Sequence, residues 1–244
     1  MSLRLARLAG ERFGNQAGLR WLDGEDVFDL AARGDLPGAL RRADAFVAAL
    51  GPAPYYLEAP VRATRMRIRL GRGDTRGALE DAQRADELAG AVKDPQVVNQ
   101  ALLCRAEALS AAGHRLQAEH VLDRLLVQQP NLGDFWLRSW AFLSLRVGRA
   151  AAFLEVASEA APTPWFQAAK AVASEHFEEA AHIYGRIGAQ AEEAEARMLA
   201  AEIAASHGQR DDAEHQLALA LEFFRRAGAT AYVRRGETLL ATTA

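Results

Sequence analysis

Near its middle the chain reads Gly113-His114-Arg115-Leu116-Gln117-Ala118, a glycine followed five residues later by a small residue. The same pair recurs at five other places: Gly34/Ala39, Gly73/Ala78, Gly148/Phe153, Glu175/Ala180 and Gly208/Ala213. Two copies are imperfect, because Phe153 is large and Glu175 is not a glycine. Successive first members lie 39, 40, 35, 27 and 33 residues apart. A period of about 34 residues is typical of helix–turn–helix units that stack in a line.

Each copy of the pair marks the end of one helix and the start of the next. Glycine tolerates the left-handed conformation just after a helix, so it suits the turn. Asp35 and Asp74 directly follow two of the glycines and are natural N-caps for the second helix. Apolar residues recur four and seven positions after the small residue, as Leu122 and Leu125 do after Ala118, which is the spacing of one buried helix face.

Helix-breaking residues close the units: Gly51, Gly90, Pro130, Pro162, Gly188 and Gly228. We therefore expect an all-α fold, a right-handed α-solenoid of about six helical hairpins with a capping helix at its C-terminal end. The expected hairpins cover about 17–50, 56–90, 95–129, 132–161, 164–187 and 190–227, and the cap covers 230–242. A further helix is expected within 1–16. No linker divides the chain, so residues 1–244 are expected to form a single solenoid domain.

Composition excludes several classes of protein. The chain has 244 residues, of which 50% are hydrophobic and 25% charged, and its net charge is −3. Nucleic-acid binders usually carry a basic excess, so no nucleic-acid partner is expected. No apolar run approaches the roughly 20 residues of a membrane span, and no signal peptide is recognisable, so we expect a cytoplasmic protein without a membrane partner. The single cysteine, Cys104, is expected to be a buried structural thiol.

The third repeat, with Gly113, Ala118, Leu125 and Pro130, resembles the tetratricopeptide repeat. In that family a glycine, a small residue five positions on, a second small residue seven further and a proline near the end recur in each unit. Leu125 replaces the second small residue here, and the aromatic signature of the first helix is poorly kept. The resemblance implies a scaffold that holds a protein or peptide partner and performs no catalysis.

A second resemblance covers about 190–242. The stretch Ala194-Glu195-Ala196-Arg197-Met198-Leu199-Ala200-Ala201 leads through Gly208 and Ala213 to residues 220–240. It is similar to the end of the repeat region in bacterial multidomain signalling ATPases, where the repeats bind an inducer or partner and govern the ATPase. This chain has neither a P-loop nor a cyclase-like domain, so only the sensor or scaffold role carries over, whether the chain is an excised module or a free-standing relative.

Four arginines at steps of three, four and three residues share one helix face: Arg62, Arg65, Arg69 and Arg72. Apolar residues flank this arginine stripe, which we expect to face solvent. One interpretation is a binding face for an acidic peptide or a phosphorylated group. The other is a ladder of surface ion pairs with Asp23 and Asp26, which precede Arg62 and Arg65 by one repeat.

Aromatic residues gather around 135–166. One helix face, made of Trp136, Trp140, Leu143 and Val147, is most simply core. A second face could line a groove and anchor an apolar side chain of a peptide: Phe135, Ser139, Phe142 and Arg146. Core packing remains the alternative for this second face.

No motif indicates catalysis, a cofactor or a metal. His120, His182 and His215 occupy equivalent positions on different repeats, too far apart to share one ion, and no short Cys/His cluster occurs. No Ser/His/Asp or Cys/His arrangement has a recognisable context.

The leading hypothesis is therefore a non-catalytic scaffold or sensor of a bacterial signalling or transcription-regulatory system. Its concave surface, lined mainly by first helices, is expected to hold a protein or peptide. The alternative is a helical small-molecule-binding or catalytic protein with a pocket near 135–166.

Overall fold

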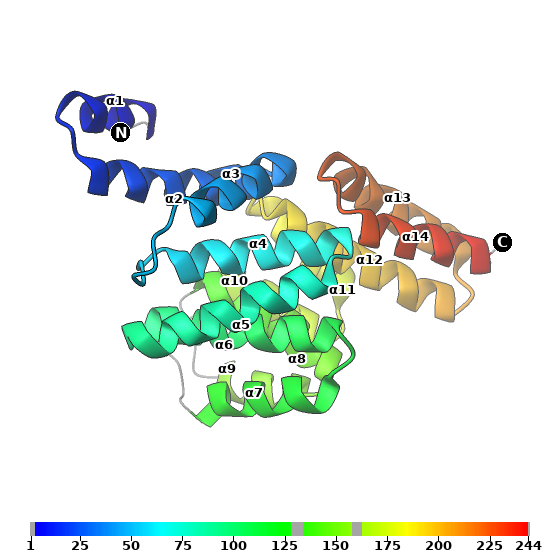
Figure 1. Cartoon of the computed structure of the whole chain (residues 1–244). Helices are drawn as coiled ribbons and strands as arrows, with labels where there is room; N and C mark the ends of the chain where they lie inside the picture. Colours follow the sequence, from blue (N-terminus) through cyan, green and yellow to red (C-terminus); the bar gives the residue numbers. More distant parts are fainter. Residues whose placement is uncertain (1–2, 128–133, 158–162, 244) are drawn as a thin grey trace.

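The computed structural model describes residues 3–127, 134–157 and 163–243, and within these ranges it contains α-helices and no strand (Figure 1). The helices are α1 (Leu3–Arg12), α2 (Gln16–Ala32), α3 (Leu36–Ala48), α4 (Glu58–Arg72), α5 (Thr75–Val92), α6 (Pro95–Ala111), α7 (Arg115–Val127), α8 (Asp134–Val147), α9 (Ala150–Ala157), α10 (Pro164–Ala173), α11 (Phe177–Arg186), α12 (Gln190–Ser206), α13 (Arg210–Arg226) and α14 (Thr230–Thr243).

Consecutive helices from α2 to α13 pair as hairpins, and neighbouring hairpins stack. Contacts join α2 to α3, α4 to α5, and so on to α12 and α13, while α4 packs on α6 and α8 on α10. The predicted all-α solenoid of about six hairpins with a terminal helix is confirmed; its right-handedness stays a prediction. Pro130 and Pro162, expected to end two hairpins, lie outside the described residues.

The turn at Gly73 shows why the sequence pattern works. Gly73 has φ +82°, in the left-handed region, and the carboxylate of Asp74 accepts a hydrogen bond from the Gly77 backbone N–H at 2.9 Å. The turn thus ends α4 and caps α5 in two residues. Glu175 holds the same left-handed conformation, φ +61°, without being a glycine.

The second member of each pair is buried where hairpin helices meet. The six side chains are at most 3% exposed: Ala39, Ala78, Ala118, Phe153, Ala180 and Ala213. Alanine lets two helices approach closely, and the fourth unit fills the same place with a ring. Trp140 packs edge-on against that ring, with 5.5 Å between the ring centres.

The core runs along the stack as several clusters. The largest spans α6 to α12 and contains Leu102, Leu143 and Tyr184. A second joins α12, α13 and α14, and Leu36 of α3 packs against it. The first hairpin thus contacts the C-terminal core through Leu36.

The stack curls until its C-terminal helix meets the second hairpin. Figure 1 shows α14 beside the C-terminal end of α4, and the two helices are in contact. The hydroxyl of Thr230 donates a hydrogen bond to the carbonyl oxygen of Arg72 at 3.1 Å. A Cβ atom on Gly71 would lie 3.7 Å from the Cβ of Ala229, so small residues on both sides permit the approach. We call this junction between α14 and the α4–α5 turn the seam. The sequence did not predict this contact between α14 and the second hairpin.

Candidate functional site

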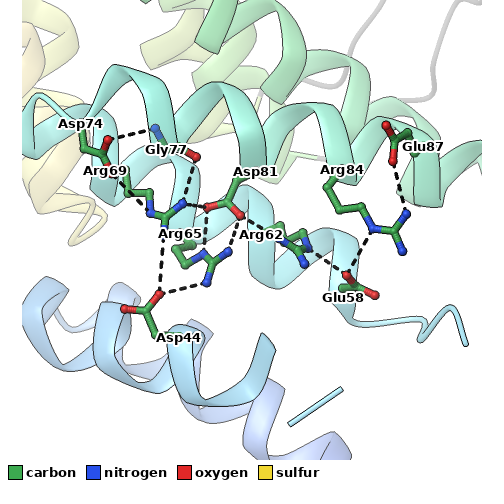
Figure 2. A network of polar contacts seen from close by, with 10 residues as sticks. All are labelled: Asp44, Glu58, Arg62, Arg65, Arg69, Asp74, Gly77, Asp81, Arg84 and Glu87. Carbon is green, nitrogen blue, oxygen red and sulfur yellow. Dashed lines mark hydrogen bonds and ion pairs between the residues drawn. The ribbon is translucent and has the colours of Figure 1, made fainter. Parts of the chain in front are cut away.

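Three members of the arginine stripe converge on Asp81 of α5 (Figure 2). Both oxygens of this carboxylate accept from Arg65, at 2.5 and 2.8 Å. Arg62 donates to it at 3.0 Å and Arg69 at 2.9 Å. Asp81 is only 1% exposed and Arg65 only 7%, so one buried carboxylate holds three guanidinium groups between α4 and α5.

Two further carboxylates accept hydrogen bonds from the stripe. Asp44 of α3 accepts from Arg65 at 2.9 Å, which ties one hairpin to the next. Glu58 accepts from Arg62 at 2.9 Å, and Arg84 lies 3.7 Å from the same carboxylate. Since acids already surround these cations, an incoming anion would have to displace an existing ion pair.

The expected partners and exposure of the stripe were wrong. Asp23 and Asp26 do not face it; they hold Arg7 of α1 and Arg42 of α3, at 2.6 to 2.9 Å. The stripe does not lie in solvent along its length either, because α3 and α5 cover its middle. The ladder interpretation correctly predicted ion pairs for these arginines, but it named Asp23 and Asp26 as the partners in place of Asp81, Asp44 and Glu58.

Arg72, the last residue of the stripe, lies apart from this network. It is half-buried at the C-terminal end of α4. Its Nη2 atom is 3.9 Å from the place that a Cβ on Gly228 would take, so its guanidinium group reaches the seam.

The described residues of the predicted aromatic groove do not share one surface. Phe142 is 4% exposed and stacks on Tyr184, with ring centres 6.2 Å apart, so it belongs to the core. Ser139 is half-buried, and exposed Arg146 forms an ion pair with Glu195 of α12. Phe135 lies in α8, and its side chain is outside what the structure describes. A partner could not reach Phe142 without opening the core.

A second, half-buried ion pair joins α4 to α6, and the sequence did not predict it. Arg67 of α4 donates to Glu107 of α6 at 2.9 Å, and Cys104 lies fully buried close by. Burial works against the charged form of Arg67, but nearby carboxylates, Glu107 first, outweigh it and raise the pKa of Arg67 above its ordinary value. The offset of 40 residues between Arg67 and Glu107 is about one repeat, which is the signal that could have found the pair.

The thiol of Cys104 should make stability depend on alkaline pH. Burial raises the pKa of Cys104 to about 12; the cation of Arg67 opposes this shift and Glu107 adds to it. The thiol of the unfolded chain ionises near pH 8.5, whereas the thiol of the folded chain stays protonated. Above that pH, ionisation therefore lowers the free energy of the unfolded state and leaves that of the folded state unchanged. The free energy of unfolding should fall by about 1.4 kcal/mol per pH unit from about pH 9 towards 12.

Urea unfolding of the wild type and of Cys104→Ala between pH 8 and pH 11 checks this expectation. Other groups titrate alike in both proteins. The contribution of Cys104 is therefore the difference between the two slopes of unfolding free energy against pH. Parallel curves for the two proteins would show that the buried thiol does not couple to folding.

The described ranges contain neither a cluster of metal-binding side chains nor a membrane-spanning helix. No three or more His, Cys, Asp or Glu side chains gather there in a way that could hold a metal ion. Among the described helices, each is too short or too polar to serve as a transmembrane span.

No known family model matches the sequence, and no curated protein matches it. Among solved structures, this chain is similar to a tetratricopeptide repeat protein from Parabacteroides merdae ATCC 43184. The two share 15% sequence identity, and the match covers 92% of this chain and 98% of the other with a TM-score of 0.43.

Proposed function

We propose that this chain is a non-catalytic protein- or peptide-binding scaffold, acting in the cytoplasm as the sensing part of a bacterial signalling or transcription-regulatory system. Stacked hairpins provide a long surface whose parts are fixed relative to one another, which suits them to hold a partner. The similarity of 190–242 to the repeat region of signalling ATPases supports the regulatory role.

One observation carries the binding role. Helix α1 buries none of its residues and leaves large apolar side chains in solvent: Leu5 is 59% exposed and Leu8 52%, and Phe13 just after the helix is 78% exposed. End units of solenoids need a polar outer face to stay soluble. An exposed apolar group at such an end indicates contact with another protein.

The described side chains around 135–166 do not favour the alternative of a catalytic or metabolite pocket. Trp140, Phe142 and Phe166 are each at most 8% exposed and belong to the main core. We therefore propose no second function.

The proposal is tested by affinity capture with the full chain under reversible cross-linking, followed by calorimetry between the purified chain and each captured protein. A captured protein that binds with micromolar affinity or better supports the scaffold role. Failure to find any such protein, together with turnover of a metabolite by the purified chain, would contradict it.

The exposed end of the stack gives a specific prediction. Leu8→Glu should change the free energy of unfolding by less than about 0.5 kcal/mol, because surface substitutions away from packed features usually stay within that range. The same change should weaken capture of a partner that contacts α1. Thermal unfolding measures the first effect and calorimetry the second. A large loss of stability would mean that α1 is packed in solution.

A further inference from the structure

Two arginines cross the seam in opposite directions. Arg72, at the end of α4, reaches Gly228 in the α13–α14 turn. Arg234 of α14 reaches the other way: its Nη2 atom lies 2.8 Å from the place that a Cβ on Gly73 would take. Both guanidinium groups therefore lie at one junction. The elements that carry them are far apart in sequence, since 158 residues separate Arg72 from Thr230.

Positive charge is left over at this junction. Arg225 beside it pairs with Glu237 at 3.4 Å. Arg72 and Arg234 form no ion pair with any carboxylate in the described part of the chain. Half-buried Arg72 and exposed Arg234 therefore bring two cations without a carboxylate partner to one junction of a chain whose net charge is −3.

A pocket of about 370 Å³ opens at the same place. Its lining residues are Phe224, Arg225, Gly228, Thr230, Val233 and Arg234. The ring of Phe224 stacks on Tyr232 with centres 4.3 Å apart, which fixes the apolar wall. This volume is at the small end of ligand sites and suits one side chain of a peptide.

We propose that the seam pocket binds an acidic peptide segment of a partner protein. Carboxylates of the segment pair with Arg72 and Arg234, and an adjacent apolar side chain lies against half-buried Val233, which Phe224 supports from the core. Arginine is suited to this role, because its planar guanidinium group grips carboxylates by paired hydrogen bonds. The proposal rests on the scaffold function and names one of its binding sites.

Binding there has a structural consequence. A segment held by Arg72 of α4 and Arg234 of α14 joins the C-terminal helix to the second hairpin. Because it binds the closed state and not the unfolded chain, it raises the midpoint of thermal unfolding as its concentration rises.

The test uses the full chain and a short fluorescein-labelled peptide of alternating Glu and Leu, with binding followed by fluorescence anisotropy. A peptide of alternating Gln and Leu is the uncharged match. The variants are Arg72→Gln and Arg234→Gln, and the control is Arg210→Gln. Arg210 is exposed and lies at the opposite end of α13 from the seam, paired with Glu214 at 2.8 Å.

Each seam variant is expected to weaken binding of the Glu–Leu peptide about tenfold, the effect of losing one charge-assisted contact. Arg210→Gln should bind as the wild type does, and the Gln–Leu peptide should bind all four proteins weakly. Equal binding by the seam variants and the control would overturn the proposal, and so would absence of binding by the wild type or equal binding of the two peptides to it.

The two proposals fail separately. If a captured partner binds the seam variants as tightly as the wild type, the seam site is wrong and the scaffold function stands. If peptide binding depends on both arginines but no partner protein is ever captured, the seam site is supported and the scaffold function loses its support.

Discussion

Replacing Asp81 with alanine should destabilise the fold by about 3–5 kcal/mol, the range found when one member of a buried ion pair is removed. The carboxylate is 1% exposed and holds Arg62, Arg65 and Arg69. Without it, the guanidinium group of Arg65 stays buried with only Asp44, which is itself half in solvent, as a counter-charge. Chemical denaturation followed by circular dichroism measures the change.

The neighbouring residue provides a matched control. Glu80 pairs with Arg76 on the surface, where the side chains are 64% and 92% exposed. Glu80→Ala should therefore cost no more than about 1 kcal/mol. Asp81→Asn keeps the shape and one acceptor oxygen, so it separates loss of charge from loss of volume. If Asp81→Ala unfolds within 1 kcal/mol of Glu80→Ala, the buried network does not hold α4 to α5.

Replacing Phe153 with alanine should cost about 3–5 kcal/mol, because it removes a fully buried ring and leaves a cavity. The side chain is 0% exposed and packs edge-on against Trp140. The sequence pattern would favour alanine at this position, so a comparison of repeats alone would predict a harmless or stabilising change. The structure predicts the opposite, since the fourth hairpin has adapted to the ring.

Phe13→Ala is the matched substitution at an exposed site, 78% accessible just after α1. Its effect on the free energy of unfolding should stay within about 0.5 kcal/mol. Both variants lose the same atoms, so the difference between them isolates burial. Equal effects would mean that the fourth hairpin is not packed around Phe153.

The repeated glycine–small pair was enough to predict the architecture. At Gly34, Gly73 and Gly113 the backbone is left-handed and separates the two helices of a hairpin. These features are local: a turn needs a left-handed residue, and a close helix contact needs a small one. Each can be read from a window of a few residues.

The partners of the arginine stripe could not be found by shifting one repeat against the next. Besides Asp44 of the preceding hairpin, the main acid is Asp81 on the second helix of the same hairpin, 16 residues from Arg65, and Arg42 pairs with Asp26 at the same separation. This offset crosses the turn within a hairpin, whereas the predicted ladder compared equivalent helices of successive hairpins. The packing angle between the helices decides whether charges meet within a hairpin or between equivalent helices of successive hairpins.

The seam was beyond prediction for a different reason. Whether α14 returns to α4 depends on the sum of the small rotations between six hairpins, and no local pattern records that sum. Arg72 therefore looked like one more surface arginine of the stripe. Its neighbour Gly73 was explained as a turn residue, although Gly71 and Gly73 also make room for α14.

Closure of the stack is most directly tested by pulsed electron paramagnetic resonance between two spin labels. Suitable sites are Arg76 at the start of α5 and Glu237 on α14, both exposed, in a Cys104→Ala background that removes the native thiol. If α14 rests on the α4–α5 turn, the distance distribution is short and narrow. A long, broad distribution in the unliganded chain would contradict the closed stack and the seam site with it.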